Sequence, residues 1–211
     1  MEEQRYFHGV KACVFDAYGT LFDLPSATHQ LMTNPGDTTK LTATTETGAV
    51  ASPTSLATYP DKAERLGQIW RQKQLEYSWL RSLTGHYTSF WQVTAEALDY
   101  ALITCEIDDP ALRDALLDSY HHLIAYPDVA PVLDRLKTAG LSTAILSNGS
   151  AAMLDTVVAN AKLIAWLDTV ISAETARVFK PDYRVYQLAC DALGLEAHSI
   201  CFLSSNGWDA A

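Results

Sequence analysis

The stretch VFDAYGTLFD, residues 14–23, begins in a short apolar run and turns polar at Asp16. The apolar residues before Asp16 follow one another without alternation, which predicts a strand covered on both faces, as in parallel sheets. Three later runs share this pattern, and each is followed by a serine: STAIL before Ser147, TVI before Ser172 and SICFL before Ser204. The four runs therefore predict strands of one parallel sheet.

Helical patterns separate these runs along the chain. The segment at 128–140 has apolar residues at helical spacing, namely Val129, Val132, Leu133 and Leu136. The segment at 181–195 has a second helical pattern, which ends near Gly194. This alternation predicts an α/β fold with a doubly wound parallel sheet, built from residues 1–24 and 127–211.

Two segments of different composition follow the first predicted strand. Residues 61–126 have no strand-like run but contain long helical stretches at 62–85 and 89–105, which predict a helical cap inserted after that strand. Residues 25–60 are rich in Thr, Ser, Ala, Gly and Pro and have few large apolar side chains. We expect this second segment to be a flexible insertion.

Size and charge narrow the class of protein. The chain has 211 residues, and 48% of them are hydrophobic, enough to bury a substantial core. Its net charge of −10 argues against a nucleic-acid partner, because phosphates need a basic surface. An anionic small molecule would need a local positive pocket, since the global field repels it.

The cysteines and the apolar segments bear on the compartment. Cys13, Cys105, Cys190 and Cys201 show no metal-binding spacing, and we expect free structural thiols, since disulfide frameworks belong to short secreted chains. The sequence has no signal-peptide pattern and no apolar segment of membrane length. A cytoplasmic protein without a membrane partner is predicted.

Polar residues follow the predicted strands at the point where each strand ends. They are Asp16, the Ser147-Asn148-Gly149 segment and the Ser204-Ser205-Asn206 segment, with Lys180 after the third strand. Each alone is a weak signal, because serine and asparagine are common loop formers and a lone lysine before proline is usually a surface residue. Ligands of open parallel sheets bind at the carboxyl ends of the strands. The gathering of these polar residues at that edge therefore predicts a functional site.

Five motifs in order carry a family resemblance: VFDAYGTLFD, WRQKQLEYSWLRSL, AILSNGS, FKPDYRVY and SSNGWDA. Together they resemble the L-2-haloacid dehalogenases, within the haloacid-dehalogenase-like superfamily. The match runs over residues 10–24 and 66–211. The FDxxGT pattern alone would indicate only the superfamily, whereas the ordered set is specific to the dehalogenases.

The resemblance implies an (S)-2-haloacid dehalogenase that needs no cofactor or metal and acts on a small 2-haloalkanoic acid with water. The catalytic positions that it implies are Asp16, Thr20, Arg71, Ser147, Lys180, Tyr186, Ser204, Asn206 and Asp209. The substrate-binding positions are Tyr18, Gln72, Leu75, Phe90, Asn148 and Trp208. A homodimer through the cap helices is also implied, with contacts at Trp79, Leu80 and Leu83.

The implied roles define a covalent mechanism. Asp16 is the nucleophile, and Thr20 supports it by hydrogen bonding. Ser147, Asn148 and backbone amides near Tyr18 hold the substrate carboxylate, and Arg71 receives the halide. Lys180 pairs with the nucleophile, and Tyr186 lines the site. Ser204, Asn206 and Asp209 complete the part of the site that hydrolyses the ester, while Leu75, Phe90 and Trp208 form an apolar pocket.

Without the resemblance, the helix that carries Arg71 and Leu75 on one face is interpreted as a packing helix with a solvated arginine.

Tyr18 separates two chemistries. Phosphatases of the superfamily have a second acid two residues after the nucleophile, because an alkoxide leaving group needs a proton. Halide is the anion of a strong acid and needs none, so tyrosine at this position favours dehalogenation. Mg²⁺ is usually held by carboxylates together with substrate phosphate, whereas SSNGWDA offers only one acid, Asp209. The sequence therefore disfavours metal-dependent phosphoryl transfer.

Two features depart from the family pattern. The Thr/Ser-rich stretch at 33–58 is longer than the usual link, and the chain stops at Ala211, directly after the last motif. Family members continue through another helix and strand, so we expect this chain to be poorly soluble or weakly active. Besides the dehalogenase, two functions stay open: a phosphatase of the superfamily, or an inactive relic that serves in folding or oligomerisation.

Overall fold

The computed structural model describes residues 9–24 and 59–210. The chain divides into two compact units. The sheet unit combines Met1–Phe22 with Ala125–Ala211, and the helical unit is Asp23–Ile124. The predicted flexible insertion at 25–60 lies outside the described residues except for its last two, and the first helix after it already begins at Pro60.

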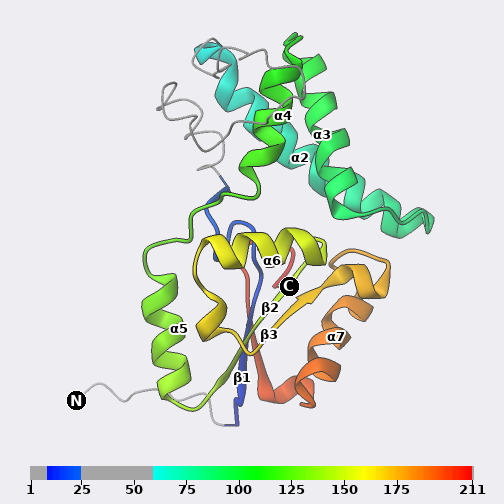
Figure 1. The fold of residues 1–211 in the computed structure, drawn as a ribbon. Helices are drawn as coiled ribbons and strands as arrows, with labels where there is room; N and C mark the ends of the chain where they lie inside the picture. The colour runs from blue at the N-terminus through cyan, green and yellow to red at the C-terminus, as the bar shows by residue number, and fades with distance from the viewer. Residues whose placement is uncertain (1–8, 25–58, 211) are drawn as a thin grey trace. The chain divides into compact units, whose positions relative to one another are not determined.

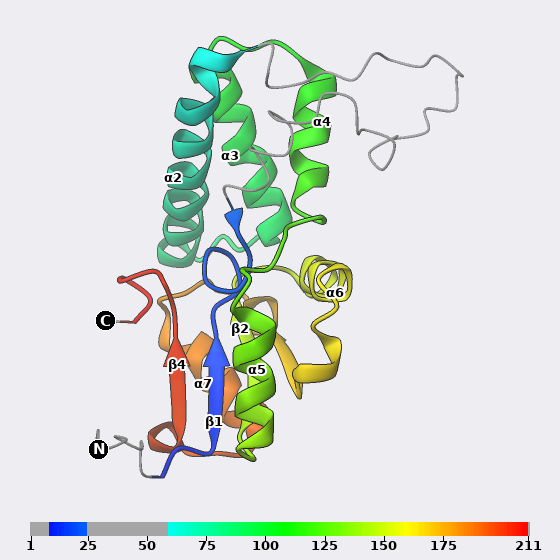
Figure 2. The same ribbon diagram turned by 90° about the vertical axis from the view of Figure 1, so that its left-hand side faces the viewer.

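In the described part of the chain, four parallel strands form one sheet in the order β3-β2-β1-β4. Figure 2 shows the neighbours β4 and β1 side by side. They are β1 (Ala12–Phe15), β2 (Ser142–Ser147), β3 (Thr169–Ser172) and β4 (Ile200–Leu203). Each coincides with one of the four predicted apolar runs, and all of β1 and nearly all of β2 are buried. The predicted α/β fold with a parallel sheet is therefore confirmed.

Helices cover both faces of this sheet. They are α5 (Val129–Thr138), α6 (Ala151–Asn160) and α7 (Tyr183–Leu193). Figure 1 shows α5 and α7 on opposite faces, which is the double winding that right-handed crossovers produce when strand order reverses. Val185 and Ala189 of α7 pack against Val14, Ala144 and Ile171 of the sheet.

The predicted helix faces agree with the structure except at one residue. Helix α7 ends at Gly194, whose φ of 63° is the left-handed conformation expected at a helix end. In α5, Val129 and Leu133 are buried, but Val132 is 39% exposed. Val132 lies at the edge of the stripe, about 100° round the helix from Leu133, because each residue turns an α-helix by that angle.

The described part of the helical unit contains α2 (Pro60–Thr84), α3 (Phe90–Thr104) and α4 (Pro110–Ser119). The first two match predicted helical stretches, whereas α4 was not singled out as a helix. It begins after Asp109, whose side chain accepts a hydrogen bond from the Leu112 N–H at 2.9 Å. Among the residues that the structure describes, no helix has the length and apolar character to cross a membrane.

Candidate active site

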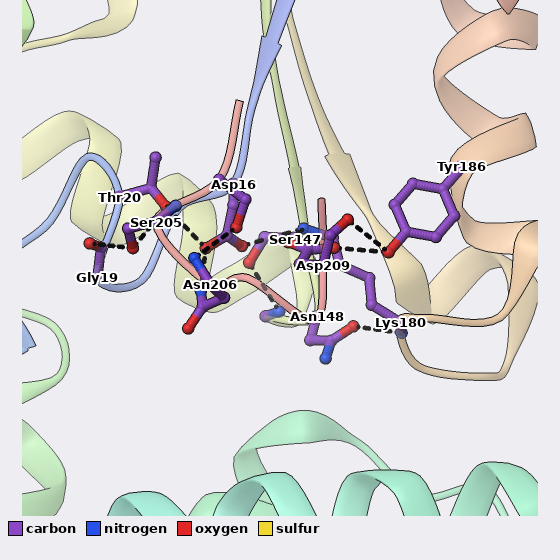
Figure 3. Close-up of polar contacts among 12 residues, drawn as sticks. Asp16, Gly19, Thr20, Ser147, Asn148, Lys180, Tyr186, Ser205, Asn206 and Asp209 are labelled. Atoms are coloured by element: carbon purple, nitrogen blue, oxygen red, sulfur yellow. Dashed lines mark hydrogen bonds and ion pairs between the residues drawn. The ribbon is translucent and has the colours of Figure 1, made fainter. Parts of the chain in front are cut away.

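The structure brings the predicted strand-end residues of the sheet unit together. Figure 3 shows Asp16, Asn148, Lys180, Asn206 and Asp209 around one site. Asp16 follows β1, Asn148 follows β2, and the last two residues follow β4, while Lys180 lies in the loop after β3. The carboxyl ends of the parallel strands thus supply the polar side chains to one edge of the sheet.

Asp16 is held by donors on both carboxylate oxygens. Its Oδ1 accepts from Lys180 Nζ at 3.0 Å, and its Oδ2 accepts from Thr20 Oγ1 and Asn206 Nδ2, each at 3.1 Å. Its backbone N–H donates to the Leu203 carbonyl of β4 at 2.9 Å. These donors stabilise the charged carboxylate and fix its direction, while Oδ1 keeps acceptor capacity for a reacting atom.

Lys180 joins two carboxylates. Its side chain is 1% exposed, and Nζ lies 3.0 Å from Asp16 Oδ1 and 2.9 Å from Asp209 Oδ2. The ammonium also lies 4.8 Å from the centroid of the Phe202 ring, within the range of a cation–π contact. A buried cation is costly unless it is paired, and here two anions and an aromatic face surround it.

Asp209 is the second acid of this cluster. Tyr186 donates its hydroxyl to Asp209 Oδ1 at 2.6 Å, a contact drawn in Figure 3. Burial of Tyr186, and then its bond to Asp209, raise the pKa of the tyrosine, so it keeps its proton and acts as a donor. With Lys180 on the other oxygen, Asp209 is fixed at both ends.

Ser205 ties the segment after β4 to the turn after β1. Its N–H donates to Thr20 Oγ1 at 2.9 Å, and its hydroxyl donates to the Gly19 carbonyl at 2.6 Å. Thr20 has one hydroxyl proton, which is directed at Asp16 Oδ2 or at Ser205 Oγ, 3.2 Å away. The predicted residue Ser204 has a local role, since its Oγ accepts from the Asn206 N–H at 3.2 Å.

Sequence reasoning did not assign a role to Ser205. The residue stands between two predicted site residues in the SSNG segment, and that adjacency was the available signal. Two neighbouring serines have identical side chains, so their roles separate only when the backbone direction is known.

The segment after β2 presents hydrogen-bond donors. Asn148 Oδ1 accepts from the Lys180 backbone N–H at 2.9 Å, so its Nδ2 is turned away from that contact and is the donor end of the amide. Ser147 Oγ accepts from the Gly149 N–H at 3.2 Å. Ser172 on β3 donates to the Gly149 carbonyl at 2.6 Å and so anchors the segment from the neighbouring strand.

Tyr18 lies against this segment. The ring is buried, and a Cβ added to Gly149 would come within 2.8 Å of Tyr18 Cε2. A real Cβ does not approach an atom that closely, so glycine is required for the ring to pack here. The donor end of Asn148 and the Ser147 hydroxyl make a local environment that suits an anion.

The remaining predicted residues lie mostly in the helical unit. Arg71 is half-buried on α2 and donates to Gln74 Oε1 at 2.9 Å. Gln72 is exposed and donates to Glu76 at 2.7 Å. Leu75 on α2 is half-buried, and Phe90 at the start of α3 is buried. In the sheet unit, Trp208 is half-buried on the segment that carries Asn206 and Asp209.

The acids of the described residues do not gather as a metal site. Over 9–24 and 59–210, His, Cys, Asp and Glu side chains nowhere form a group of three or more that could hold an ion. Asp16 and Asp209 instead share the Lys180 ammonium, and a tyrosine, Tyr18, stands two residues after Asp16.

Comparison with known proteins places this geometry in a family. Residues 10–211 match the haloacid dehalogenase-like hydrolases. The chain is 45% identical to (S)-2-haloacid dehalogenase 4A of Burkholderia cepacia over 201 residues, which cover 95% of this chain and 77% of that protein. It is 46% identical to (S)-2-haloacid dehalogenase of Xanthobacter autotrophicus over 202 residues, 95% of this chain and 69% of the relative.

This chain also matches a solved structure from the same family as these relatives. It is L-2-haloacid dehalogenase from Xanthobacter autotrophicus with chloropropionic acid covalently bound, and it matches with a TM-score of 0.77 at 42% identity. The match covers 95% of this chain and 71% of that one. The chain therefore belongs to the haloacid dehalogenase-like hydrolases and, within them, to the (S)-2-haloacid dehalogenase family.

Proposed function

We propose that this chain hydrolyses short L-2-haloacids to D-2-hydroxy acids through an ester on Asp16. One observation carries the proposal: a buried carboxylate at the end of β1 is held by Lys180, Thr20 and Asn206, and Tyr18 replaces the second acid of a phosphatase. The names of the relatives, and the covalently bound chloropropionic acid in one of their structures, support the same chemistry.

The first step is a displacement at the halogen-bearing carbon. A carboxylate oxygen of Asp16 forms a C–O bond from the side opposite the halogen, and the electron pair of the breaking C–halogen bond leaves on the halide. The configuration at that carbon inverts. A carboxylate is a modest nucleophile, so its fixed direction and partial desolvation must supply much of the rate. Ser147 and Asn148 are the proposed partners of the substrate carboxylate.

Arg71, in the helical unit, is the cation that the resemblance assigns to the departing halide. Halide leaves without a proton, so the guanidinium needs to supply only charge and hydrogen-bond donors. The helical unit is proposed as the cap of the enzyme. Leu75 and Phe90 of that unit and Trp208 of the sheet unit are the proposed apolar contacts with the substrate. Gln72 stays a proposed substrate contact on the resemblance alone.

The second step frees the enzyme. Water attacks Cγ of the Asp16 ester, and negative charge develops on a carboxyl oxygen that already has Lys180 or Asn206 as a donor. Asp209, which shares Lys180 with Asp16, is the proposed acceptor of the proton from water. Collapse of the intermediate breaks the bond between Cγ and the substrate oxygen, and that oxygen takes up the proton held by Asp209. The other proton of the water is lost to solvent, so Asp16 returns to a carboxylate and the hydroxy acid leaves.

No metal is required in this proposal, because Lys180 supplies the cation between the two acids. The test is halide release from L- and D-2-chloropropionate, with and without EDTA. We expect release from the L enantiomer, at a rate that EDTA leaves unchanged. Equal consumption of both enantiomers, or loss of activity in EDTA that Mg²⁺ restores, would contradict the proposal.

We also propose that two copies of the chain associate through the helical unit. Leu80 and Leu83 on α2 are 55% and 83% exposed, and Ile103 on α3 is 77% exposed, an unusual set for helices that face only water. Sedimentation should give a dimer that Leu83→Lys dissociates, and a monomer at all concentrations would contradict this. A cytoplasmic location is proposed from the four free thiols.

A further inference from the structure

We infer that Gln74 is a positioning residue that holds Arg71 in place to receive the halide. The inference rests on the proposed function, since Arg71 has its halide role only there. Gln74 lies within the WRQKQLEYSWLRSL motif, but it is not among the site residues that the resemblance implies. It makes a direct contact with Arg71, whose Nη1 lies 2.9 Å from Gln74 Oε1.

Gln74 occupies a position where an apolar side chain would be expected. The buried stripe of α2 runs through Leu66, Trp70, Gln74 and Ser78, each four residues after the last. Gln74 is 0% exposed. Burying an amide is costly unless its donors and acceptor are all bonded, so a glutamine here needs partners.

The partners fix the orientation of the amide. Gln74 Nε2 donates to Thr94 Oγ1 at 2.8 Å and to the Tyr120 hydroxyl at 3.2 Å. The Thr94 hydroxyl gives its own proton to the Phe90 carbonyl at 2.8 Å, so toward Gln74 it can only accept. The nitrogen of the amide must therefore face Thr94, and the oxygen must face Arg71, because a flipped amide would set acceptor against acceptor at Thr94 and donor against donor at Arg71.

A rigid shell surrounds this network. The indole N–H of Trp70 donates to the Thr94 carbonyl at 2.9 Å, and the Trp70 and Tyr120 rings lie 5.1 Å apart. Trp70, Thr94 and Tyr120 are all buried. They come from α2, α3 and the end of α4, so the position of Gln74 is set by contacts from these three helices.

A neutral acceptor has a chemical advantage at this position. The arginine side chain has many rotamers, and one fixed acceptor removes much of that freedom before the halide arrives. A carboxylate would hold the guanidinium more tightly but would also cancel its charge. An amide oxygen orients the cation without cancelling its charge.

This role predicts a dependence on the leaving group. Chloride is a poorer leaving group than bromide, so stabilisation of the departing anion matters more for chlorinated substrates. The experiment compares wild type with Gln74→Leu, Gln74→Glu and Arg71→Leu, and uses Gln68→Leu as a matched control. Gln68 lies on the same helix, is exposed, and donates to Glu64 at 3.1 Å.

The measurements are kcat/KM for L-2-chloropropionate and L-2-bromopropionate, inhibition by added bromide, and the melting temperature. Both Gln74 variants should lower kcat/KM for the chloro substrate about tenfold or more. Gln74→Leu removes the hydrogen bond to the Arg71 guanidinium, and Gln74→Glu cancels the charge of that guanidinium. The loss should be smaller for the bromo substrate, and bromide should inhibit less. Gln68→Leu should match wild type.

A structural role alone would give another result. If both Gln74 variants melt lower but keep the bromo-to-chloro ratio and the bromide inhibition of wild type, the inference is overturned. Gln74→Glu keeps the size of the side chain and decides the matter if Gln74→Leu fails to fold.

Two further outcomes separate this inference from the proposed function. In the first, wild type releases halide, and Arg71→Leu has the same ratio of kcat/KM for the bromo and chloro substrates as wild type. That result overturns the inference, while the proposed dehalogenase function stands. A wild type that releases no halide overturns both.

Discussion

Replacing Lys180 with methionine tests the charge balance of the active site. The Lys180 side chain is 1% exposed, and the carboxylates of Asp16 and Asp209 beside it are 10% and 0% exposed. Methionine fills a similar volume but removes the cation. Two buried carboxylates then stand close together without a positive charge, so one must take up a proton or the site must open. Asp16 loses its fixed, charged state in either case, and we expect activity to fall to background.

The cost to stability follows from the burial. Removing one partner of a buried ion pair costs about 3–5 kcal/mol, because an uncompensated charge is left in the interior. Each kcal/mol lowers the melting temperature of a chain of this size by roughly 2–4 °C. Lys180→Met should therefore melt roughly 6–20 °C below wild type. The loss is a large part of the total stability of a typical domain, about 5–15 kcal/mol.

The matched control is Lys137→Met. Lys137 pairs with Asp168 at 2.5 Å, but the two side chains are 34% and 40% exposed, and an exposed pair contributes only about 0–1 kcal/mol. Urea unfolding followed by circular dichroism at pH 7 measures both variants. The double variant Lys180→Met/Asp209→Asn should recover part of the stability, since it removes one of the two charges. A loss in Lys180→Met no larger than in the control would refute the reasoning.

Three further predictions concern single side chains. Gly149→Ala sets a Cβ 2.8 Å from Tyr18 Cε2 and should lower the free energy of unfolding by about 1–3 kcal/mol. In the control Gly207→Ala, the new Cβ meets nothing within 4 Å, and the change should be less than about 0.5 kcal/mol. Equal effects in urea unfolding would contradict this. Burial, and then the Asp209 contact, raise the pKa of Tyr186, so its stabilising effect is complete below the ordinary tyrosine pKa near 10 and is lost as pH rises toward the folded pKa. The free energy of unfolding should therefore fall above about pH 10, and less steeply in Tyr186→Phe; identical slopes would argue against the shift. Burial, with the neighbouring Cys201 thiol, raises the pKa of Cys13 to about 11, so iodoacetamide at pH 8 should label Cys13 in the unfolded chain and spare it in the native one, as mass spectrometry would reveal.

The sheet could be predicted from the sequence because its strands are short, continuous apolar runs. A parallel strand buried on both faces requires such a run, and β1 to β4 each coincide with one. The convergence of Asp16, Asn148 and Asn206 followed from the same argument, since parallel strands end at one edge. Helix α4 was not singled out, because its ten residues include several charges and carry only a short apolar stripe.

The contact partners of the predicted site residues could not be predicted in the same way. Gln72 and Gln74 are two residues apart on one helix, and the sequence prediction named Gln72, which is exposed, rather than Gln74, which is buried. The available signal was the four-residue spacing from Leu66 through Trp70 to Gln74, which continues an apolar stripe. Ser172 was noted only as the end of a strand, because its bond to the Gly149 carbonyl depends on the register of β2 and β3.

Isotope labelling of Asp16 tests the covalent mechanism most directly. In a single turnover with enzyme in excess over L-2-chloropropionate in H₂¹⁸O, water attacks Cγ of the Asp16 ester. Mass spectrometry of the peptide that contains Asp16 should then show one heavy oxygen in its carboxylate, and the hydroxy acid should carry none. Label in the hydroxy acid, with an unlabelled Asp16, would mean that water attacks the substrate directly, and it would contradict the account.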